Sequence, residues 1–145
     1  MIELYADMWT VEADARCITT NGYINKARMC VMGRGTARQA ATRYPWLPLH
    51  LGYLIAIYGN ECFPIWTPDG WLVSFPVKHR WEQSADPRLI EQSCKQLVQM
   101  TDWYDWRTVV LPRPGAGAGR LDYETQVKPI IAPLLDGRFY VVTFG

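Results

Sequence analysis

The sequence predicts an α/β domain in which a mixed sheet lies between helices. At 145 residues the chain has the length of one domain, and it contains no repeat or linker, so residues 1–145 are expected to form a single domain. The second half alternates helical and strand patterns, which is typical of this class. Two of its segments, 107–112 and 138–144, are almost continuously apolar, as expected for strands buried on both faces of a sheet.

Strands dominate the prediction for the first half of the chain. Their segments are rich in β-branched and aromatic residues and are bounded by turn residues such as Asn21-Gly22. Five segments are predicted as strands: 2–6, 15–20, 53–59, 62–66 and 71–76. One helix is predicted among them, because residues 33–45 begin with a glycine pair, continue with small residues and end at Pro45.

The clearest helix is predicted over residues 86–100. Asp86 is a suitable N-cap, and Pro87 fits the first helical position, where its missing N–H costs nothing. The apolar residues recur at helical spacing and share one face: Leu89, Ile90, Cys94, Leu97 and Val98. A further helix is expected over 122–131.

The composition excludes several classes of protein. The formal net charge is +1 with no basic stripe, which argues against broad electrostatic capture of nucleic acid. No run of about 18 apolar residues is present, so we expect no membrane span, and the first residues do not resemble a secretory leader. Cys17, Cys30, Cys62 and Cys94 have no metal-ligand spacing. They indicate reduced thiols of a cytoplasmic protein without a metal site.

Two glycine loops follow predicted strands. Gly115, Gly117 and Gly119 lie at the end of one strand, where a left-handed backbone or a close approach would require glycine. Gly33 and Gly35 follow another strand and lead into a helix. A flexible turn is the simplest interpretation of one such loop, but both leave the carboxyl ends of strands, where α/β proteins bind ligands. Together the loops predict a diphosphate ligand.

Five segments resemble motifs of the macrodomain family, whose members bind ADP-ribose, and they occur in the family's order. They are "YADMW" from Tyr5, "CITTN" from Cys17, "VMGRGTA" from Val31, "FPVKHRW" from Phe75 and "LPRPGAGAGRLDYETQVKP" from Leu111. The resemblance implies a three-layer α/β/α macrodomain. The "FPVKHRW" segment is similar to that of antitoxin macrodomains, which remove ADP-ribose from DNA. A human relative of this subgroup removes terminal ADP-ribose from glutamate.

The resemblance implies a set of residues that contact ADP-ribose. Asp7 would accept a hydrogen bond from the adenine amino group beside the Met8 backbone, Phe144 would lie against adenine, and Asn21 would face the distal ribose. The two loops would bind the diphosphate through Val31, Met32, Gly33, Arg34, Gly35 and Thr36 on one side and Pro112, Gly115, Ala116, Gly117, Ala118 and Gly119 on the other. Without the resemblance, Asp7 and Asn21 also fit ordinary turns, and Phe144 fits a core position.

The resemblance makes Lys78 the predicted catalytic residue, assisted by Asn21, whereas without it Lys78 also fits an exposed lysine at a strand end. A lysine at this strand end would face the ligand cleft, and a lowered pKa would make its amine a nucleophile toward the anomeric carbon of ribose. His79 or Arg80 could supply the neighbouring cation, or both could point outward. The glutamate-directed relative carries an aspartate where this chain has Gly119, so a lysine–carboxylate relay is not expected.

The resemblance leaves three functions open. The first is an ADP-ribosyl hydrolase acting on modified DNA, other nucleic acid or protein. The second is a phosphatase for ADP-ribose 1″-phosphate, and the third is a binding module for ADP-ribose. Asn25 and Lys26, in a segment longer than in the family, could contact the target. We expect no cofactor, no membrane partner and a monomeric protein.

Overall fold

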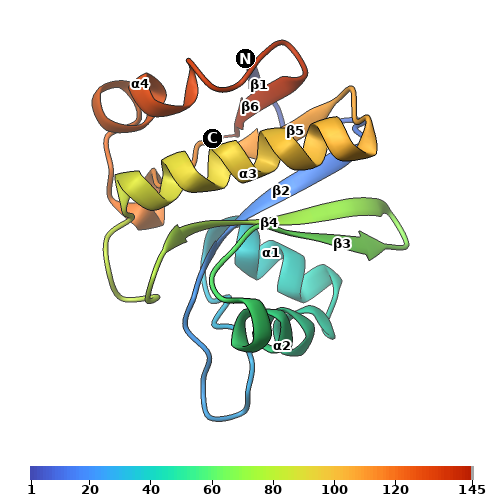
Figure 1. The fold of residues 1–145 in the computed structure, drawn as a ribbon, viewed down its shortest axis with the longest axis vertical. Coiled ribbons are helices and arrows are strands. Elements are labelled where there is room, and N and C mark those ends of the chain that lie inside the picture. The colour runs from blue at the N-terminus through green and yellow to red at the C-terminus, as the bar shows by residue number, and fades with distance from the viewer. Residues whose placement is uncertain (145) are drawn as a thin grey trace.

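Helices cover both faces of a six-stranded sheet in the computed structural model, which describes residues 1–144 (Figure 1). The strand order is β1-β6-β5-β2-β4-β3. Every neighbouring pair is parallel except the antiparallel pair β3–β4, so the predicted mixed sheet is confirmed. The strands are β1 (Ile2–Tyr5), β2 (Ala15–Asn21), β3 (Phe63–Thr67), β4 (Gly70–Lys78), β5 (Val109–Pro112) and β6 (Phe139–Thr143).

A separate apolar core lies on each face of the sheet. Helices α1 (Gly35–Arg43) and α2 (Leu47–Tyr58) pack on one face. Helices α3 (Pro87–Tyr104) and α4 (Lys128–Ile131) pack on the other, together with the π-helical turn Tyr123–Val127. Alternate strand residues enter different cores, as Val109 and Val110 of β5 do, because successive side chains point to opposite faces. The predicted three-layer arrangement is confirmed.

The longest helix follows its prediction closely. The carboxylate of Asp86 accepts a hydrogen bond from the backbone N–H of Arg88 at 2.9 Å, so Asp86 is the N-cap. Leu89, Ile90, Cys94 and Leu97 are buried, and Val98 packs partly buried against the same core. The helix continues to Tyr104, four residues beyond the predicted end. The six strands lie within one or two residues of predicted segments, and all four cysteines are buried free thiols.

The strand predicted over residues 53–59 is wrong, because residues 53–58 form the second half of α2 and Gly59 is its C-cap. This helix begins at Leu47, has Pro48 in its first turn and ends before Gly59, whose φ is +92°. Its sequence is apolar on nearly every side, so residues 53–59 alone show no helical period. Within residues 1–144, no helix is long and apolar enough to cross a membrane.

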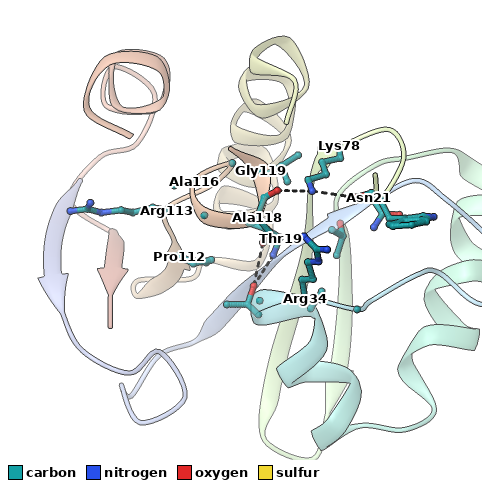
Figure 2. Close-up of a pocket in the computed structure, with 18 of the residues that line it drawn as sticks. Thr19, Asn21, Arg34, Lys78, Pro112, Arg113, Ala116, Ala118 and Gly119 are labelled. Atoms are coloured by element: carbon teal, nitrogen blue, oxygen red, sulfur yellow. Dashed lines mark hydrogen bonds between the residues drawn. The ribbon is translucent and has the colours of Figure 1, made fainter. Parts of the chain in front are cut away.

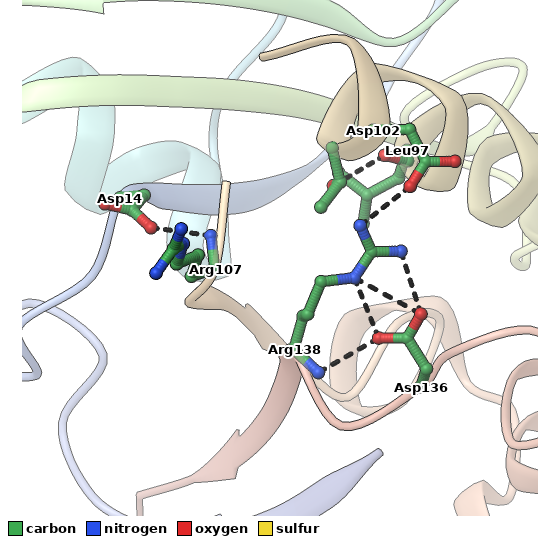
Figure 3. Close-up of polar contacts among 7 residues, drawn as sticks. Asp14, Leu97, Asp102, Arg107, Asp136 and Arg138 are labelled. Atoms are coloured by element: carbon green, nitrogen blue, oxygen red, sulfur yellow. Dashed lines mark hydrogen bonds and ion pairs between the residues drawn. The ribbon is translucent and has the colours of Figure 1, made fainter. Parts of the chain in front are cut away.

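Polar contacts hold the amino ends of the strands (Figure 3). The carboxylate of Asp14, just before β2, accepts the backbone N–H groups of Arg107 at 2.7 Å and Thr108 at 3.1 Å. Arg138, just before β6, pairs with Asp136 at 2.8 Å and with Asp102 of α3 at 2.7 Å. These contacts fix the end of the sheet opposite to the glycine loops, which leave the carboxyl ends of β2 and β5.

Candidate functional site

The carboxyl ends of β2, β4, β5 and β6 surround a pocket of about 830 Å³ (Figure 2). The predicted site residues line it with three exceptions, which are Asp7, Met8 and Met32. Both glycine loops contribute to its wall, as does Lys78 at the end of β4. The volume falls within the range of small-molecule pockets.

The first loop presents the amino end of α1 to the pocket. Arg34 is the N-cap residue, but no side chain caps the helix. Among the residues that the structure describes, the backbone N–H groups of Gly35, Thr36 and Ala37 have no hydrogen-bond acceptor. Thr36 is held in place because its Oγ1 accepts the backbone N–H of Thr19 at 3.1 Å. Free N–H groups at a helix amino end form a site for an anion.

The glycines of the second loop are required for different reasons. Gly115 has φ +79°, and a Cβ there would lie 2.7 Å from Cδ1 of Ile90. Gly117 has φ +66°, although a Cβ would meet no atom within 4 Å. Gly119 has no such φ, but a Cβ would lie 3.0 Å from Cβ of Ala85. Packing against Ala85 thus disfavours any side chain at position 119, including the aspartate of the glutamate-directed relative.

The charged residues that line the pocket are all cationic. They are Arg34, Lys78 and Arg113, and no Asp, Glu or His lies among the lining residues that the structure describes. The guanidinium of Arg113 lies over the ring of Tyr123, 4.2 Å from its centroid, so Arg34 and Lys78 are the cations that face the pocket (Figure 2). The backbone N–H groups of Gly117 and Ala118 also lack an acceptor within residues 1–144. The pocket therefore suits a polyanion such as a diphosphate.

Lys78 is buried, with only 8% of its surface exposed. Its Nζ donates hydrogen bonds to the carbonyl oxygens of Ala118 at 2.9 Å and Trp81 at 3.4 Å. Burial lowers the pKa of Lys78 below the ordinary lysine value, and the charges of Arg120 and Arg34 lower it further. This amine is therefore more easily deprotonated than an exposed one.

His79 and Arg80 make contacts of their own on the surface. The ring of His79 bonds to Asp86 at 2.7 Å, and Arg80 pairs with Glu82 at 2.6 Å. The cations that lower the pKa of Lys78 are Arg120 and Arg34, so the alternative in which His79 and Arg80 point outward describes the structure. Arg120 was missed because its place beside Lys78 depends on how the second loop folds back over β4.

Asn21 lines the pocket, and its side chain is bonded on both sides. It is 9% exposed, its Oδ1 accepts the backbone N–H of Tyr23 at 2.9 Å, and its Nδ2 donates to the carbonyl of Val31 at 2.9 Å. The amide thus ties together the ends of the segment 22–30. One Nδ2–H remains for a ligand, because an amide nitrogen carries two.

The segment 22–30 and the strand ends add residues that were not predicted. Asn25 lines the pocket, whereas Lys26 does not. The unpredicted lining residues are Thr19, Thr20, Tyr23, Ala37, Val77, Trp81, Arg113, Val142 and Thr143. Most of them are the last residues of predicted strands or the residues next to them, so strand direction alone could have identified them.

Of the predicted adenine contacts within the described residues, Phe144 lines the pocket, whereas Asp7 and Met8 do not. Asp7 forms a turn in which its Oδ1 accepts the backbone N–H of Trp9 at 3.0 Å. The backbone N–H of Ala6 bonds to the carbonyl of Thr143 at 2.9 Å, so Asp7 follows directly after a contact with β6. Phe144 lines the pocket and is largely exposed. The side chains of Met8 and Met32 are core residues, because both are buried against α1 and α2.

No protein-family model matches this sequence, and no curated protein is similar to it in sequence. Solved structures do match. The macrodomain of Mycobacterium tuberculosis DarG superposes with a TM-score of 0.77 at 22% identity, over 99% of this chain and 97% of that chain. The macrodomain of Thermus aquaticus DarG superposes with a TM-score of 0.81 at 22% identity, over 97% of this chain and 95% of that chain. The structure of Thermosipho africanus DarTG in complex with ADP-ribose superposes with a TM-score of 0.81 at 17% identity, over 96% of this chain but only 40% of that chain.

Proposed function

The chain has the macrodomain fold, and we propose that it is an ADP-ribosyl hydrolase that binds ADP-ribose in the pocket between the two glycine loops. One observation carries the catalytic part of this proposal. Lys78 lines the pocket beneath the second loop, and burial together with the charges of Arg120 and Arg34 lowers its pKa. Perturbed titratable groups in a pocket are frequent at catalytic sites.

The geometry supports ADP-ribose as the ligand. The amino end of α1 and the second loop each offer free backbone N–H groups, one for each phosphate of a diphosphate. Arg34 and Lys78 supplement these donors. A structural neighbour with a TM-score of 0.81 is in complex with ADP-ribose.

Lys78 can act as the nucleophile in its neutral form. A neutral amine has two N–H groups and one lone pair, and the carbonyls of Ala118 and Trp81 match the two N–H groups. In the proposed step the lone pair forms a bond to the anomeric carbon of ribose. The bond from that carbon to the target breaks, and its electron pair leaves with the target. The nitrogen, which has become positively charged, gives one proton to the departing target. Water then attacks the anomeric carbon, and the carbon–nitrogen bond breaks with its electron pair on nitrogen, which takes up a proton of the water and becomes the neutral amine again.

Two aromatic side chains favour a nucleobase as the target. Tyr23 and Trp81 line the pocket beside Asn21 and Lys78, and Trp81 is 48% exposed. The guanidinium of Arg80 lies 4.5 Å from the ring centroid of Tyr23. Single-stranded bases stack on such rings. We therefore propose modified DNA, the target of the antitoxin macrodomains that the sequence resembles, as the first substrate to test.

The test compares three substrates under the same conditions. The protein is incubated with ADP-ribosylated single-stranded DNA, with ADP-ribosylated protein and with ADP-ribose 1″-phosphate, and free ADP-ribose is measured. We expect release from the DNA. Lys78→Ala should lower the rate by orders of magnitude but change the affinity for ADP-ribose by less than about tenfold.

Lys95→Ala is the matched control, because Lys95 is an exposed lysine of α3 outside the pocket. It should keep the rate of the wild-type protein. Full activity of Lys78→Ala, or activity toward ADP-ribose 1″-phosphate alone, would contradict the hydrolase. The second outcome would favour the phosphatase, and binding without turnover would favour the binding module.

A further inference from the structure

Helix α2 is apolar on its outer face as well as on the face that packs into the core. The helix Leu47–Tyr58 contains no Asp, Glu, Lys or Arg. Its inner residues Leu47, Leu51 and Ile55 are buried in the core beside α1. A helix that is apolar on all sides is normally covered on all sides. Figure 1, however, shows α2 at the edge of the molecule, and its outer face is exposed within residues 1–144.

Large apolar side chains lie on this outer face at helical spacing. Leu49, Tyr53 and Ile57 are spaced four residues apart and form one ridge along the helix. They are 51%, 65% and 53% exposed. Trp46 has helical backbone angles just before α2, is 44% exposed and packs edge-on against His50, with 5.9 Å between the ring centroids. The outer face of α2 thus consists of Trp46, Leu49, His50, Tyr53, Ala56 and Ile57.

The exposed area of this face matches the area that a dimer needs. Its four large apolar side chains, together with His50 and Ala56, expose roughly 600 Å² in one copy of the chain. Two such faces in contact would therefore bury about 1,200 Å², which is the lower limit of the usual range for specific interfaces. A contiguous apolar patch of this size on a single chain marks an interaction site.

The outer face of α2 is also complementary to itself. In a two-fold symmetric contact, the same surface of both copies meets, so a charged residue near the axis would face its own charge. This face carries no Asp, Glu, Lys or Arg. An antiparallel contact of two α2 helices with its axis at Tyr53 pairs Leu49 of one copy with Ile57 of the other, because each is four residues from Tyr53. The same contact pairs the large side chain of His50 with the small one of Ala56, which allows the helices to approach closely.

We infer that the outer face of α2 is the interface of a symmetric dimer of this chain. The dimer replaces the monomer expected from the sequence, in which residues 53–59 were predicted as a strand rather than as half of this helix. No residue of the outer face lines the pocket, so the inference is independent of the proposed hydrolase function. A Kd of about 1–100 µM is expected, since contacts near the lower limit of area bind weakly.

The test is sedimentation velocity of the wild-type protein over concentrations from about 1 to about 500 µM, which include the expected Kd. We expect conversion from monomer to dimer without larger species, because a two-fold contact is closed. Tyr53→Glu places two like charges at the axis and should weaken the dimer at least about 100-fold. Circular dichroism shows that this variant is folded, as expected for a change at an exposed position.

Trp103→Glu is the matched control, because Trp103 is an aromatic residue of α3, 84% exposed, on the other side of the sheet. This variant should form the dimer with the Kd of the wild-type protein.

A second measurement locates the axis. Tyr53→Cys should form a disulfide between two copies under mild oxidation, whereas the wild-type protein should not, because its four cysteines are buried. A wild-type protein that remains monomeric at the highest concentration would overturn the inference, and the outer face of α2 would then bind a different partner. The inference is also wrong if Tyr53→Glu forms the dimer as readily as the wild-type protein, or if Trp103→Glu abolishes it.

Discussion

Three influences act on the amino group of Lys78. Burial penalises its charged form, and so do the charges of Arg120 and Arg34, whereas the carbonyls of Ala118 and Trp81 accept its N–H groups. The first two influences lower the pKa of Lys78. The carbonyls orient the amine whether or not it is charged. A lysine in these surroundings combines a fixed position with a larger neutral fraction near neutral pH.

The pH profile of the proposed hydrolase follows from this environment. Since the neutral amine is the active form, the rate should rise with pH through the pKa of Lys78 and then level off. Arg120→Gln removes a cation that lowers this pKa, so the pKa should rise and the rising limb should move to higher pH. Measurements of kcat against pH for both proteins test this expectation.

Arg120→Lys keeps the positive charge and is the matched control for that profile. The kcat of Arg120→Lys should rise over the same pH range as the kcat of the wild-type protein. Identical pH profiles for Arg120→Gln and the wild-type protein would show that titration of Lys78 does not control the rate.

The sequence placed Lys78 at the carboxyl end of a strand, the family resemblance placed Asn21 at the ligand, and both line the pocket. It could not locate Arg120, which follows Lys78 by 42 positions and reaches it only through the fold of the second loop. It also could not show that the Asn21 amide is bonded within the segment 22–30. Contacts between loops depend on three-dimensional packing, which has no period in the sequence.

At the scale of elements, two segments of different kinds form the anion site. One is the amino end of α1, whose nine residues align their peptide dipoles toward the pocket. The other is the loop after β5, which needs a left-handed backbone at Gly115 and Gly117. The glycine pattern predicted both loops, because glycine adopts a positive φ without a steric cost.

Gly117 tests whether that backbone serves a ligand. A β-branched residue at φ +66° is strained, and a Cβ there would meet no protein atom within 4 Å, so it would project into open space at the pocket. Gly117→Val should therefore abolish ADP-ribose binding, measured by calorimetry, in a protein that remains folded by circular dichroism.

Gly137→Val is the control, because this glycine has no positive φ, has open space around it and lies outside the pocket. It should bind ADP-ribose normally. Wild-type affinity in a folded Gly117→Val variant would mean that the loop is only a turn.

Helix α2 shows where the pattern of a single element misleads. A helix that is apolar on nearly all sides lacks the period that separates helix from strand, and residues 53–59 therefore resemble a buried strand. The evidence for the helix lay earlier, at Leu47 and Pro48, where the first turn begins. Its packing required Gly52, because a Cβ there would lie 2.2 Å from the carbonyl oxygen of Arg28.

At the scale of the whole molecule, the sheet separates two ends with different roles. The amino ends of the strands are fixed by Asp14 and Arg138, and the carboxyl ends carry the glycine loops (Figure 3). The α/β fold class, the arrangement of helices on both faces of the sheet and most of the strands were predictable, since they follow from the periodicity and composition of the sequence. The strand order was not, because the position of β2 between β5 and β4 depends on packing between distant segments.

Ligand binding should therefore stabilise the molecule as one unit. The pocket joins β2, β4, β5 and β6 with α1, so unfolding of either core would destroy it. A ligand that binds only the native state at 100 times its Kd adds about 2.7 kcal/mol to the free energy of unfolding. For a chain of this length that corresponds to a rise in Tm of roughly 8 °C.

Thermal unfolding with and without saturating ADP-ribose measures this rise directly, and Gly117→Val should show none of it. A Tm that ADP-ribose leaves unchanged while other nucleotides raise it would overturn ADP-ribose as the ligand of the glycine loops.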